Sequence, residues 1–252
     1  MRWLNPANLT WLFAHLVVLL LGIIMMNAEA NLLLLNKSWS EAIGSGLVAT
    51  GITGEILFLY VLLSDRVSAR FEILAKAGLI KVFPHRSVRM KEEYHSRLKH
   101  AKEIDVLGFG QSHFRQDYGD EFRKLSLQAT VRVVLIDPDF PSTDFSIADL
   151  RDNEEDNQVG RIRDDVEAFI RTVRDAAGLN RNRFKIRLLR AIPCVSLFRI
   201  DDEIFWGPYF VGQQSRNTPT FLAQRGGFLY NDLKEHFDLV WESDKFSAPI
   251  KL

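Results

Sequence analysis

Cysteine is almost absent from this chain of 252 residues, which contains Cys194 alone. A single cysteine cannot form a disulfide within the chain, and this agrees with a reducing compartment. The sequence also lacks Cys/His clusters with the spacing of zinc ligands, and we expect neither a metal nor a cofactor. Its 32 basic and 32 acidic residues balance, so the net charge indicates no strongly acidic or basic partner.

Charge is scarce in the N-terminal quarter, where two long apolar runs cover residues 9–28 and 43–63. The first run contains one ionisable residue, His15, and the second contains only Glu55. A helix rises about 1.5 Å per residue and needs roughly 20 apolar residues to cross the hydrocarbon core. We therefore expect a transmembrane hairpin over residues 1–63. A cleavable signal peptide is the alternative for the first run, with a loose Ala-x-Ala-like site at residues 28–30.

Basic residues follow the second run. Between residues 64 and 102 there are ten Lys and Arg against four Asp and Glu, whereas the connection between the runs has only Lys37. Basic residues that flank membrane helices stay on the cytoplasmic side. We expect both termini in the cytoplasm and the chain in the inner (cytoplasmic) membrane.

The rest of the chain alternates between helix-like and strand-like segments. We expect a basic linker helix over residues 64–87 and a cytoplasmic domain over residues 88–252. Alternating strands and helices predict an α/β sandwich around a mixed sheet. The expected strands cover residues 104–108, 131–136, 185–189, 194–200 and 203–206. The expected helices cover residues 87–101, which is basic, 118–126, 159–177 and 228–236.

Three stretches of this domain carry a family pattern: AKEIDVLGFGQS at residues 101–112, VVLIDPD at 133–139 and SLFRIDDEIFWGPY at 196–209. With these stretches the domain resembles the phospholipase D-like phosphodiesterase superfamily. The resemblance covers residues 88–241, about one half-domain of that superfamily. It implies that the mixed-sheet α/β sandwich is of the phospholipase D-like type.

The chemistry of that family rests on the pattern H-x-K-(x)4-D, followed by G-S-x-N, in which the histidine attacks phosphorus. Laying Asp201 on the family's aspartate puts Cys194 at the histidine position and Ser196 at the lysine position. A thiol and a hydroxyl cannot replace an imidazole nucleophile and a fixed ammonium that stabilises phosphate charge. The resemblance therefore implies a domain without catalytic residues that keeps a cleft shaped for a phosphodiester.

Candidate ligand-binding residues come from a glycine-rich turn, from arginines and from aromatic rings. Backbone N–H groups of such a turn can approach an anion, although an ordinary tight turn has the same sequence. Guanidinium groups match phosphate oxygens, although Arg151, Arg161, Arg163 and Arg199 can equally be surface residues. Tyr209 can stack on a base or pack in the core. The candidates are Gly108, Phe109, Gly110, Ser112, His113, Arg151, Arg199 and Tyr209.

Within the two apolar runs, the ionisable and the small residues are the functional candidates. His15 and Glu55 lie at similar depth in an antiparallel hairpin and could pair, or several Glu55 side chains could line a pore. The alternatives are a structural hydrogen bond and a His15 ring that reaches the headgroups. Gly46, Thr50 and Gly54 recur at every fourth position and form a smooth stripe. This stripe favours self-association, or serves the contact between the two helices of one hairpin.

These features together predict a membrane effector. Its domain would sense a nucleotide or a single-stranded oligonucleotide, and its hairpin would form a homo-oligomer that permeabilises the membrane or forms a channel. The layout is similar to that of prokaryotic antiphage effectors, which implies a nucleotidyltransferase partner that makes the ligand. The alternatives are an active membrane-bound phosphodiesterase or nuclease and a membrane scaffold without a small ligand.

Overall fold

The computed structural model describes residues 6–27, 37–85 and 88–252. Contacts divide the chain into two units, which we call the hairpin unit (Met1–Glu72) and the sheet unit (Ile73–Leu252). Some expectations lie outside the described residues: the first five residues, the connection between the two runs over residues 28–36, and residues 86–87 at the end of the expected linker.

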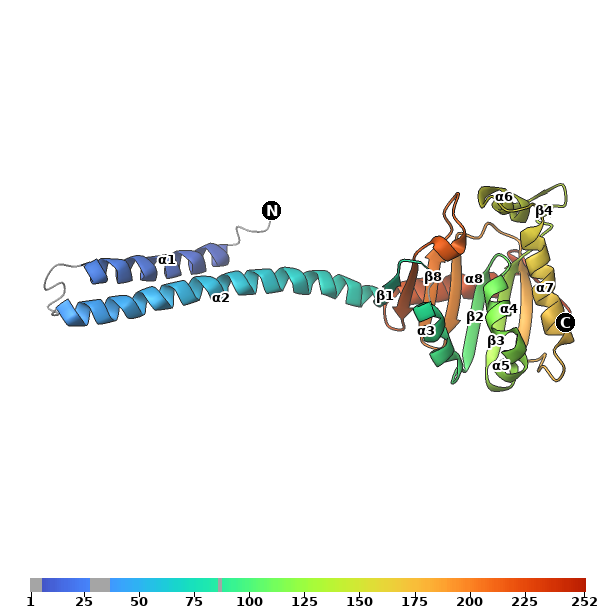
Figure 1. Cartoon of the computed structure of the whole chain (residues 1–252), viewed down its shortest axis with the longest axis horizontal. Helices are drawn as coiled ribbons and strands as arrows, with labels where there is room; N and C mark the ends of the chain where they lie inside the picture. Colours follow the sequence, from blue (N-terminus) through green and yellow to red (C-terminus); the bar gives the residue numbers. More distant parts are fainter. Residues whose placement is uncertain (1–5, 28–36, 86–87) are drawn as a thin grey trace. The chain divides into compact units, whose positions relative to one another are not determined.

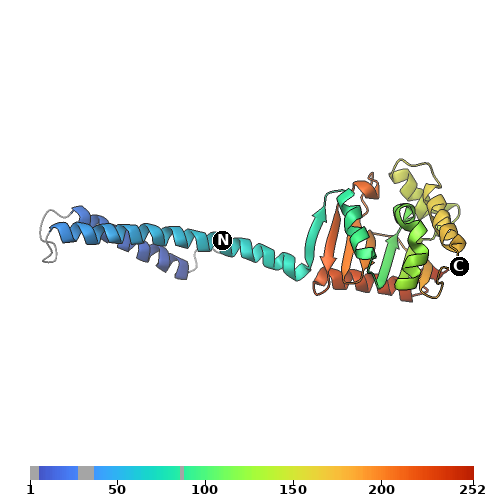
Figure 2. The same ribbon diagram turned by 60° about the horizontal axis from the view of Figure 1, so that its bottom comes forward.

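The hairpin unit consists of two long helices that lie side by side, α1 (Pro6–Asn27) and α2 (Lys37–Ala77), of which the last five residues belong to the sheet unit (Figures 1 and 2). The mean hydropathy is 2.0 over Thr10–Asn27 and 1.6 over Lys37–Val61. Only 6% and 11% of these two segments are buried, so apolar side chains face outward, unlike those of a core helix. Both helices are therefore long enough and apolar enough to cross a membrane.

Glycines allow α1 and α2 to approach closely. A Cβ atom added to Gly22 would lie 2.7 Å from the backbone nitrogen of Val48. One added to Gly51 would lie 2.8 Å from the Cβ atom and 3.0 Å from the Cα atom of Leu19. Such distances leave no room for a side chain, so the two backbones meet at these positions, as small residues permit in membrane helices.

The expected stripe of Gly46, Thr50 and Gly54 is divided between two faces of α2. A Cβ atom on Gly54 would lie 2.5 Å from Nδ1 of His15, whereas one on Gly46 would meet nothing within 4 Å. The hydroxyl of Thr50 donates to the carbonyl of Gly46 at 2.8 Å on the exposed side. Positions eight apart are rotated by about 80° on a helix. Gly54 is therefore used within the hairpin, and Gly46 and Thr50 remain on its outer face.

No hydrogen bond or ion pair joins His15 to Glu55, so the suggested pair is not formed. The His15 ring lies against Trp11, with 5.5 Å between ring centroids, and against Gly54. The Oε1 atom of Glu55 is buried and has no hydrogen-bond partner among the described residues. The hairpin therefore contains one carboxyl oxygen that its own two helices do not satisfy.

The sheet unit is built on a mixed sheet of eight strands in the order β1-β9-β8-β7-β2-β3-β6-β10. The central strands β2, β3 and β6 are parallel, and all other pairs in the sheet are antiparallel. A separate two-stranded ribbon pairs β4 (Pro141–Ser142) with β5 (Phe145–Ser146). The strands of the large sheet are β1 (Leu79–Phe83), β2 (Glu103–Gly108), β3 (Thr130–Ile136), β6 (Phe184–Leu189), β7 (Val195–Ile200), β8 (Glu203–Pro208), β9 (Thr220–Gln224) and β10 (Ser247–Pro249).

Helices cover both faces of this sheet (Figure 2). Helices α3 (Val88–Leu98), α4 (Ser112–Tyr118), α5 (Phe122–Gln128) and α7 (Arg161–Asp175) lie on one face, and α8 (Phe228–Glu242) lies on the other. On the first face the ring centroid of Phe122 lies 5.3 Å from that of Phe169 and 5.2 Å from that of Phe184. A short helix α6 (Ile147–Glu154) follows the ribbon. The α/β class and the mixed sheet are thus confirmed.

The expected boundary between linker and domain at residue 88 is wrong. Helix α2 continues to Ala77, but Leu79–Phe83 forms β1 and pairs with β9, so the sheet begins inside the expected linker. Strand β9 and the second half of α8 were also missed. Their apolar residues meet partners that are distant in sequence, and a local pattern does not contain that information.

Candidate ligand-binding cleft

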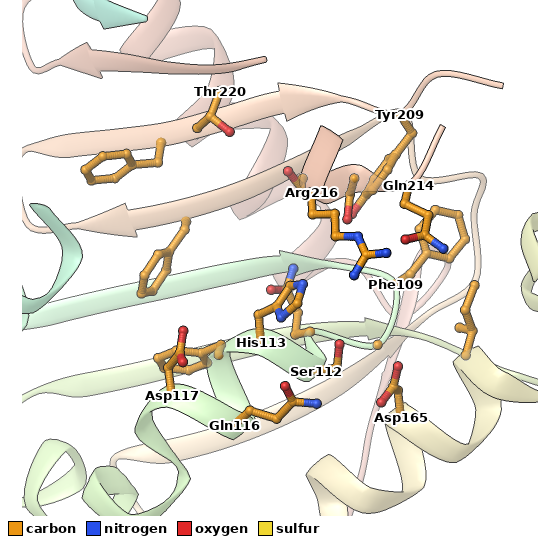
Figure 3. A pocket seen from close by; sticks show the side chains of 18 of the residues that line it. Phe109, Ser112, His113, Gln116, Asp117, Asp165, Tyr209, Gln214, Arg216 and Thr220 are labelled. Carbon is orange, nitrogen blue, oxygen red and sulfur yellow. The ribbon is translucent and has the colours of Figure 1, made fainter. Parts of the chain in front are cut away.

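A cleft of about 350 Å³ opens on the face of the sheet that carries α3 and α4 (Figure 3). This volume is at the small end of the range for ligand sites, roughly 300–1,000 Å³. Strands β7 and β8 contribute Ser196, Phe198 and Phe205 to its lining. The other lining residues used below come from α3 (Tyr94), the turn after β2 (Phe109 and Gly110), α4 (Ser112, His113 and Gln116), α7 and the segment before it (Asn157, Arg161 and Asp165), and the segment from the end of β8 to the start of β9 (Tyr209, Gln214, Arg216 and Thr220).

One end of the cleft is aromatic. Tyr94 of α3 stands edge-on to Phe198 and Phe205, with ring centroids 4.9 Å and 4.5 Å apart. Phe114 of α4 lies behind Phe198 at 5.1 Å. Phe205 is buried and Phe198 is 9% exposed, while Tyr94 is half-buried. The rings therefore form a fixed apolar surface on which Tyr94 is the accessible member.

The other end is polar and carries two arginines. Arg161, at the start of α7, donates from one terminal nitrogen to the side chain of Asn157 at 2.7 Å. Arg216 lies in a single turn of 3-10 helix (Ser215–Asn217), is exposed, and makes no hydrogen bond or ion pair with any residue that the structure describes. Its guanidinium extends over the middle of the cleft toward His113 (Figure 3). Within the cleft, Arg216 is thus a cation that no described residue engages by a hydrogen bond or an ion pair.

Asp165 of α7 is the acidic group at this polar end. Burial raises the pKa of its carboxyl group, against the opposing effect of the positive charges of Arg115 and Arg161. A terminal nitrogen of Arg115 lies 3.7 Å from the Asp165 carboxylate, and the Nε atom of Arg115 is buried without a hydrogen-bond partner in the described part of the chain. Arg115 therefore lies within ion-pair distance of the Asp165 carboxylate, whereas Arg161 and Arg216 form no ion pair with any described residue.

Five of the expected ligand-binding residues line the cleft: Phe109, Gly110, Ser112, His113 and Tyr209. The rings of Phe109 and Tyr209 meet edge-to-face, with centroids 4.8 Å apart. Burial raises the pKa of the Tyr209 phenol above its usual range, so this group stays protonated at neutral pH. Residues that are distant in sequence thus come together in one cleft.

The glycine-rich turn does not have the geometry of an anion cradle. A Cβ atom on Gly108 would lie 2.2 Å from Nε2 of Gln111 and 2.6 Å from the Tyr209 hydroxyl, and one on Gly110 would lie 2.6 Å from Cβ of Asp165. Both glycines are therefore explained by packing within the protein. Gly108 does not line the cleft, and α4 has only seven residues, too few for a strong helix dipole.

The guanidinium group of Arg151 is not available to a ligand in the cleft. It is 4% exposed and donates to the Glu155 carboxylate at 2.8 Å, to the carbonyl of Phe210 at 2.9 Å and to the carbonyl of Gln213 at 2.7 Å. The guanidinium also lies 5.8 Å from the ring centroid of Phe109 and 5.4 Å from that of Tyr209. Arg151 thus fixes the wall formed by these two rings.

Arg199 lies on the opposite face of the sheet from the cleft. Arg199 does not line the cleft, and its guanidinium interacts with Tyr230 of α8. This agrees with the alternation of side chains along β7, in which Phe198 faces the cleft. Arg199 is 2% exposed and donates to the carboxylates of Asp105 at 2.5 Å and Glu103 at 2.8 Å. Its assignment as a phosphate ligand is therefore wrong, and it belongs to the buried charge network beneath the sheet.

Of the three positions aligned with the phospholipase D-like motif, only Ser196 lines the cleft. Cys194 is exposed and precedes β7 rather than lying in it. Asp201 occupies the turn between β7 and β8, where its carboxylate accepts from the backbone N–H groups of Lys102 and Glu103, both at 2.8 Å. Asp201 thus stabilises the start of β2.

Sequence reasoning missed Tyr94 and Arg216 as site residues. Tyr94 lies in a helix that the sequence marks only by its basic residues, and Arg216 lies in a polar loop. Helix α3 and the 3-10 turn reach the cleft through packing between segments that are distant in sequence, which a local pattern does not reveal. Across residues 6–27, 37–85 and 88–252, no group of three or more His, Cys, Asp and Glu side chains is placed to hold a metal ion.

Comparisons with known proteins identify no family for this chain. No protein-family model and no curated protein matches it. Among solved structures it is similar to TrmBL2, described as an archaeal chromatin protein with a novel mode of DNA binding. That likeness has a TM-score of 0.43 and 14% sequence identity, and covers 82% of this chain and 70% of the other. Likeness at this level bears on neither the type of fold nor the function.

Proposed function

We propose that this protein is a membrane effector whose sheet unit binds a nucleotide or an oligonucleotide and thereby controls an oligomer of its hairpin. The observation that supports the ligand is the cleft itself, which combines an aromatic surface with an unengaged Arg216 guanidinium. Nucleotides present a flat apolar base and an anionic phosphate, and proteins bind them with aromatic rings and arginines.

We also propose that the sheet unit is a degenerate phospholipase D-like domain. The mixed sheet and the position of Ser196 in the cleft are compatible with this type. In this proposal the domain binds its ligand without turnover, because no imidazole and ammonium occupy the motif positions. The role fits an effector of bacterial antiphage defence, and a nucleotidyltransferase would then supply the ligand.

The hairpin is the proposed output. Two helices cannot enclose a channel, so permeabilisation requires several copies of the chain. Gly46 and Thr50 remain exposed on the outer face of α2, where they permit a second copy to approach closely. The unsatisfied Glu55 oxygen is the polar group on which a water-filled path could depend.

Depolarisation of ligand-treated vesicles tests this proposal. The full chain is reconstituted in vesicles, and a panel of mononucleotides, cyclic dinucleotides and short oligonucleotides is applied on the side of the sheet unit. We expect one ligand class to cause depolarisation, and Glu55→Ala to abolish it. Glu41→Ala is the matched control, because Glu41 is exposed and lies 4.0 Å from Lys37. Depolarisation that persists without residues 1–63, or that no ligand changes, would contradict the proposal.

An active phosphodiesterase is the second candidate, and the position of His113 favours it. Its imidazole lies in the cleft beside Ser112 and beneath Arg216 (Figure 3). An imidazole can act as nucleophile or general acid in phosphodiester cleavage. This candidate predicts hydrolysis of a phosphodiester by the purified protein, lost in His113→Ala. Mass spectrometry of a ligand that stays intact after prolonged incubation would exclude it.

A further inference from the structure

We infer that the cleft binds one nucleotide in a single orientation, with the base against Tyr94 and the phosphate between Arg161 and Arg216. This inference rests on the proposed function and deepens it, because it states the part of the ligand that each end recognises. It also concerns residues that carried no signal in the sequence, Tyr94 and Arg216.

The distribution of charge indicates which end of the cleft binds the phosphate. Arg161 and Arg216 line the polar end, and the carboxylates beside them already have cationic partners. Asp165 lies 3.7 Å from a terminal nitrogen of Arg115, and Glu155 lies 2.7 Å from one of Arg151. An anion at this end therefore meets two guanidinium groups that have no carboxylate of the described residues within ion-pair distance.

The aromatic rings indicate which end of the cleft binds the base. Tyr94, Phe198 and Phe205 are held in mutual edge-to-face contact, so a planar ligand finds a surface that is already ordered. Gln116 and Thr220 also line the cleft and carry groups that can donate to and accept from a base edge (Figure 3). At the polar end, by contrast, Phe109 and Tyr209 already pack against each other and against Arg151.

The volume sets the length of the ligand. About 350 Å³ lies between the two ends, with polar His113 and Ser196 among the lining residues. This is the low end of the volumes of small-molecule sites. The enclosed part of the ligand is therefore a single nucleotide, either free or as one residue of a longer strand whose remainder stays outside the cleft.

Calorimetric titration of the full detergent-solubilised chain tests this orientation. The probes are AMP, GMP, CMP and UMP, then the nucleoside of the tightest binder, and ribose 5-phosphate. We expect Arg216→Ala to weaken binding of the nucleotide and of ribose 5-phosphate about tenfold and to leave the nucleoside unchanged. We expect Tyr94→Leu to weaken binding of the nucleotide and of the nucleoside about tenfold and to leave ribose 5-phosphate unchanged.

Arg225→Ala is the matched control, because Arg225 is 60% exposed and pairs with Asp202 outside the cleft. Circular dichroism of each variant checks that the fold is retained. If a nucleotide binds but Arg216→Ala and Tyr94→Leu weaken the nucleoside and ribose 5-phosphate alike, the inferred orientation of the nucleotide is overturned. The proposal that the sheet unit senses a nucleotide is then unaffected. Absence of binding by every mononucleotide and by short oligonucleotides overturns both. Binding with the expected effects of both variants but without depolarisation supports the orientation and contradicts the effector function.

Discussion

Arg199 and Asp105 form the most deeply buried ion pair among the described residues, with side chains 2% and 1% exposed. The guanidinium also reaches Glu103, and Arg132 donates to the other side of the Asp105 carboxylate at 2.7 Å. Burial would disfavour the charged form of Arg199, but the nearby carboxylates outweigh this effect and raise its pKa. The buried charges balance one another only while all of these side chains are present. Replacing any one of them should therefore lower the free energy of unfolding.

Arg199→Met should therefore destabilise the sheet unit. Removing one partner of a buried pair costs about 3–5 kcal/mol, and the lower end applies here because Asp105 keeps Arg132. Hydrogen exchange of the β2 and β7 amides measures the free energy of opening locally. Arg225→Met, at an exposed pair, should change it by less than about 1 kcal/mol. Equal exchange in the two variants would contradict a structural role for Arg199.

Asp165 should make stability depend on pH in the acidic range. Burial raises its pKa in the folded protein above the value of about 3.9 in an unfolded chain. The folded state then binds more protons between the two pKa values, so stability falls as the pH rises through the folded pKa. Asp165→Asn should remove this part of the dependence. Thermal unfolding of both proteins from about pH 3.5 to about pH 7 measures it, and identical slopes would refute the assignment.

At the scale of single residues, the sequence predicted several residues that line the cleft, but it did not predict what the side chains of Arg199 and Arg151 contact. Phe109, His113 and Tyr209 were expected in the site and line the cleft. Arg199 was expected there because it is close in sequence to the motif, but the alternation along β7 turns it to the other face. Arg151 donates to the carbonyls of Phe210 and Gln213 in a loop that is distant in sequence, and no local pattern reveals these contacts.

At the scale of elements, the contact between α1 and α2 depends on particular glycines. Gly51→Ala should destabilise the hairpin by about 1–3 kcal/mol, because the new methyl group would meet the Leu19 backbone at 3.0 Å. Gly46→Ala is the control, since its methyl group would meet nothing within 4 Å and alanine favours helix. Thermal unfolding in detergent, followed by protease resistance of residues 6–63, measures both. A more stable Gly51→Ala variant would contradict the close approach.

Elements were predictable where their patterns are local. The two apolar helices follow from hydropathy alone, and β2, β3 and β6 follow from short apolar runs. Strand β1 lies inside the expected linker of residues 64–87, because a run of five residues next to a basic helix carries no local sign that it pairs with β9. Lys81 is in fact paired with Glu93 of α3, so its charge does not conflict with a place in the sheet.

At the scale of the whole molecule, the charge asymmetry predicts orientation. Ten basic residues between positions 64 and 102 should keep the sheet unit in the cytoplasm. Protease should therefore degrade residues 73–252 in inverted membrane vesicles and spare them in intact spheroplasts. The reverse pattern would refute the orientation. Replacing Arg66, Arg70 and Lys76 by glutamine should give a mixture of both orientations, because these charges lie near the end of the second apolar run, where positive charge sets the topology.

The edge position of β1 decides how a soluble fragment of this protein should be cut. A fragment that starts at residue 88, where the sequence alone places the domain, lacks the strand that pairs with β9. It exposes the β9 backbone as an open edge and leaves the ring of Phe205 without its neighbour Phe83. Open edges recruit other chains, so this fragment should aggregate during expression. A fragment that starts at Ile73 keeps β1 and should remain monodisperse in gel filtration.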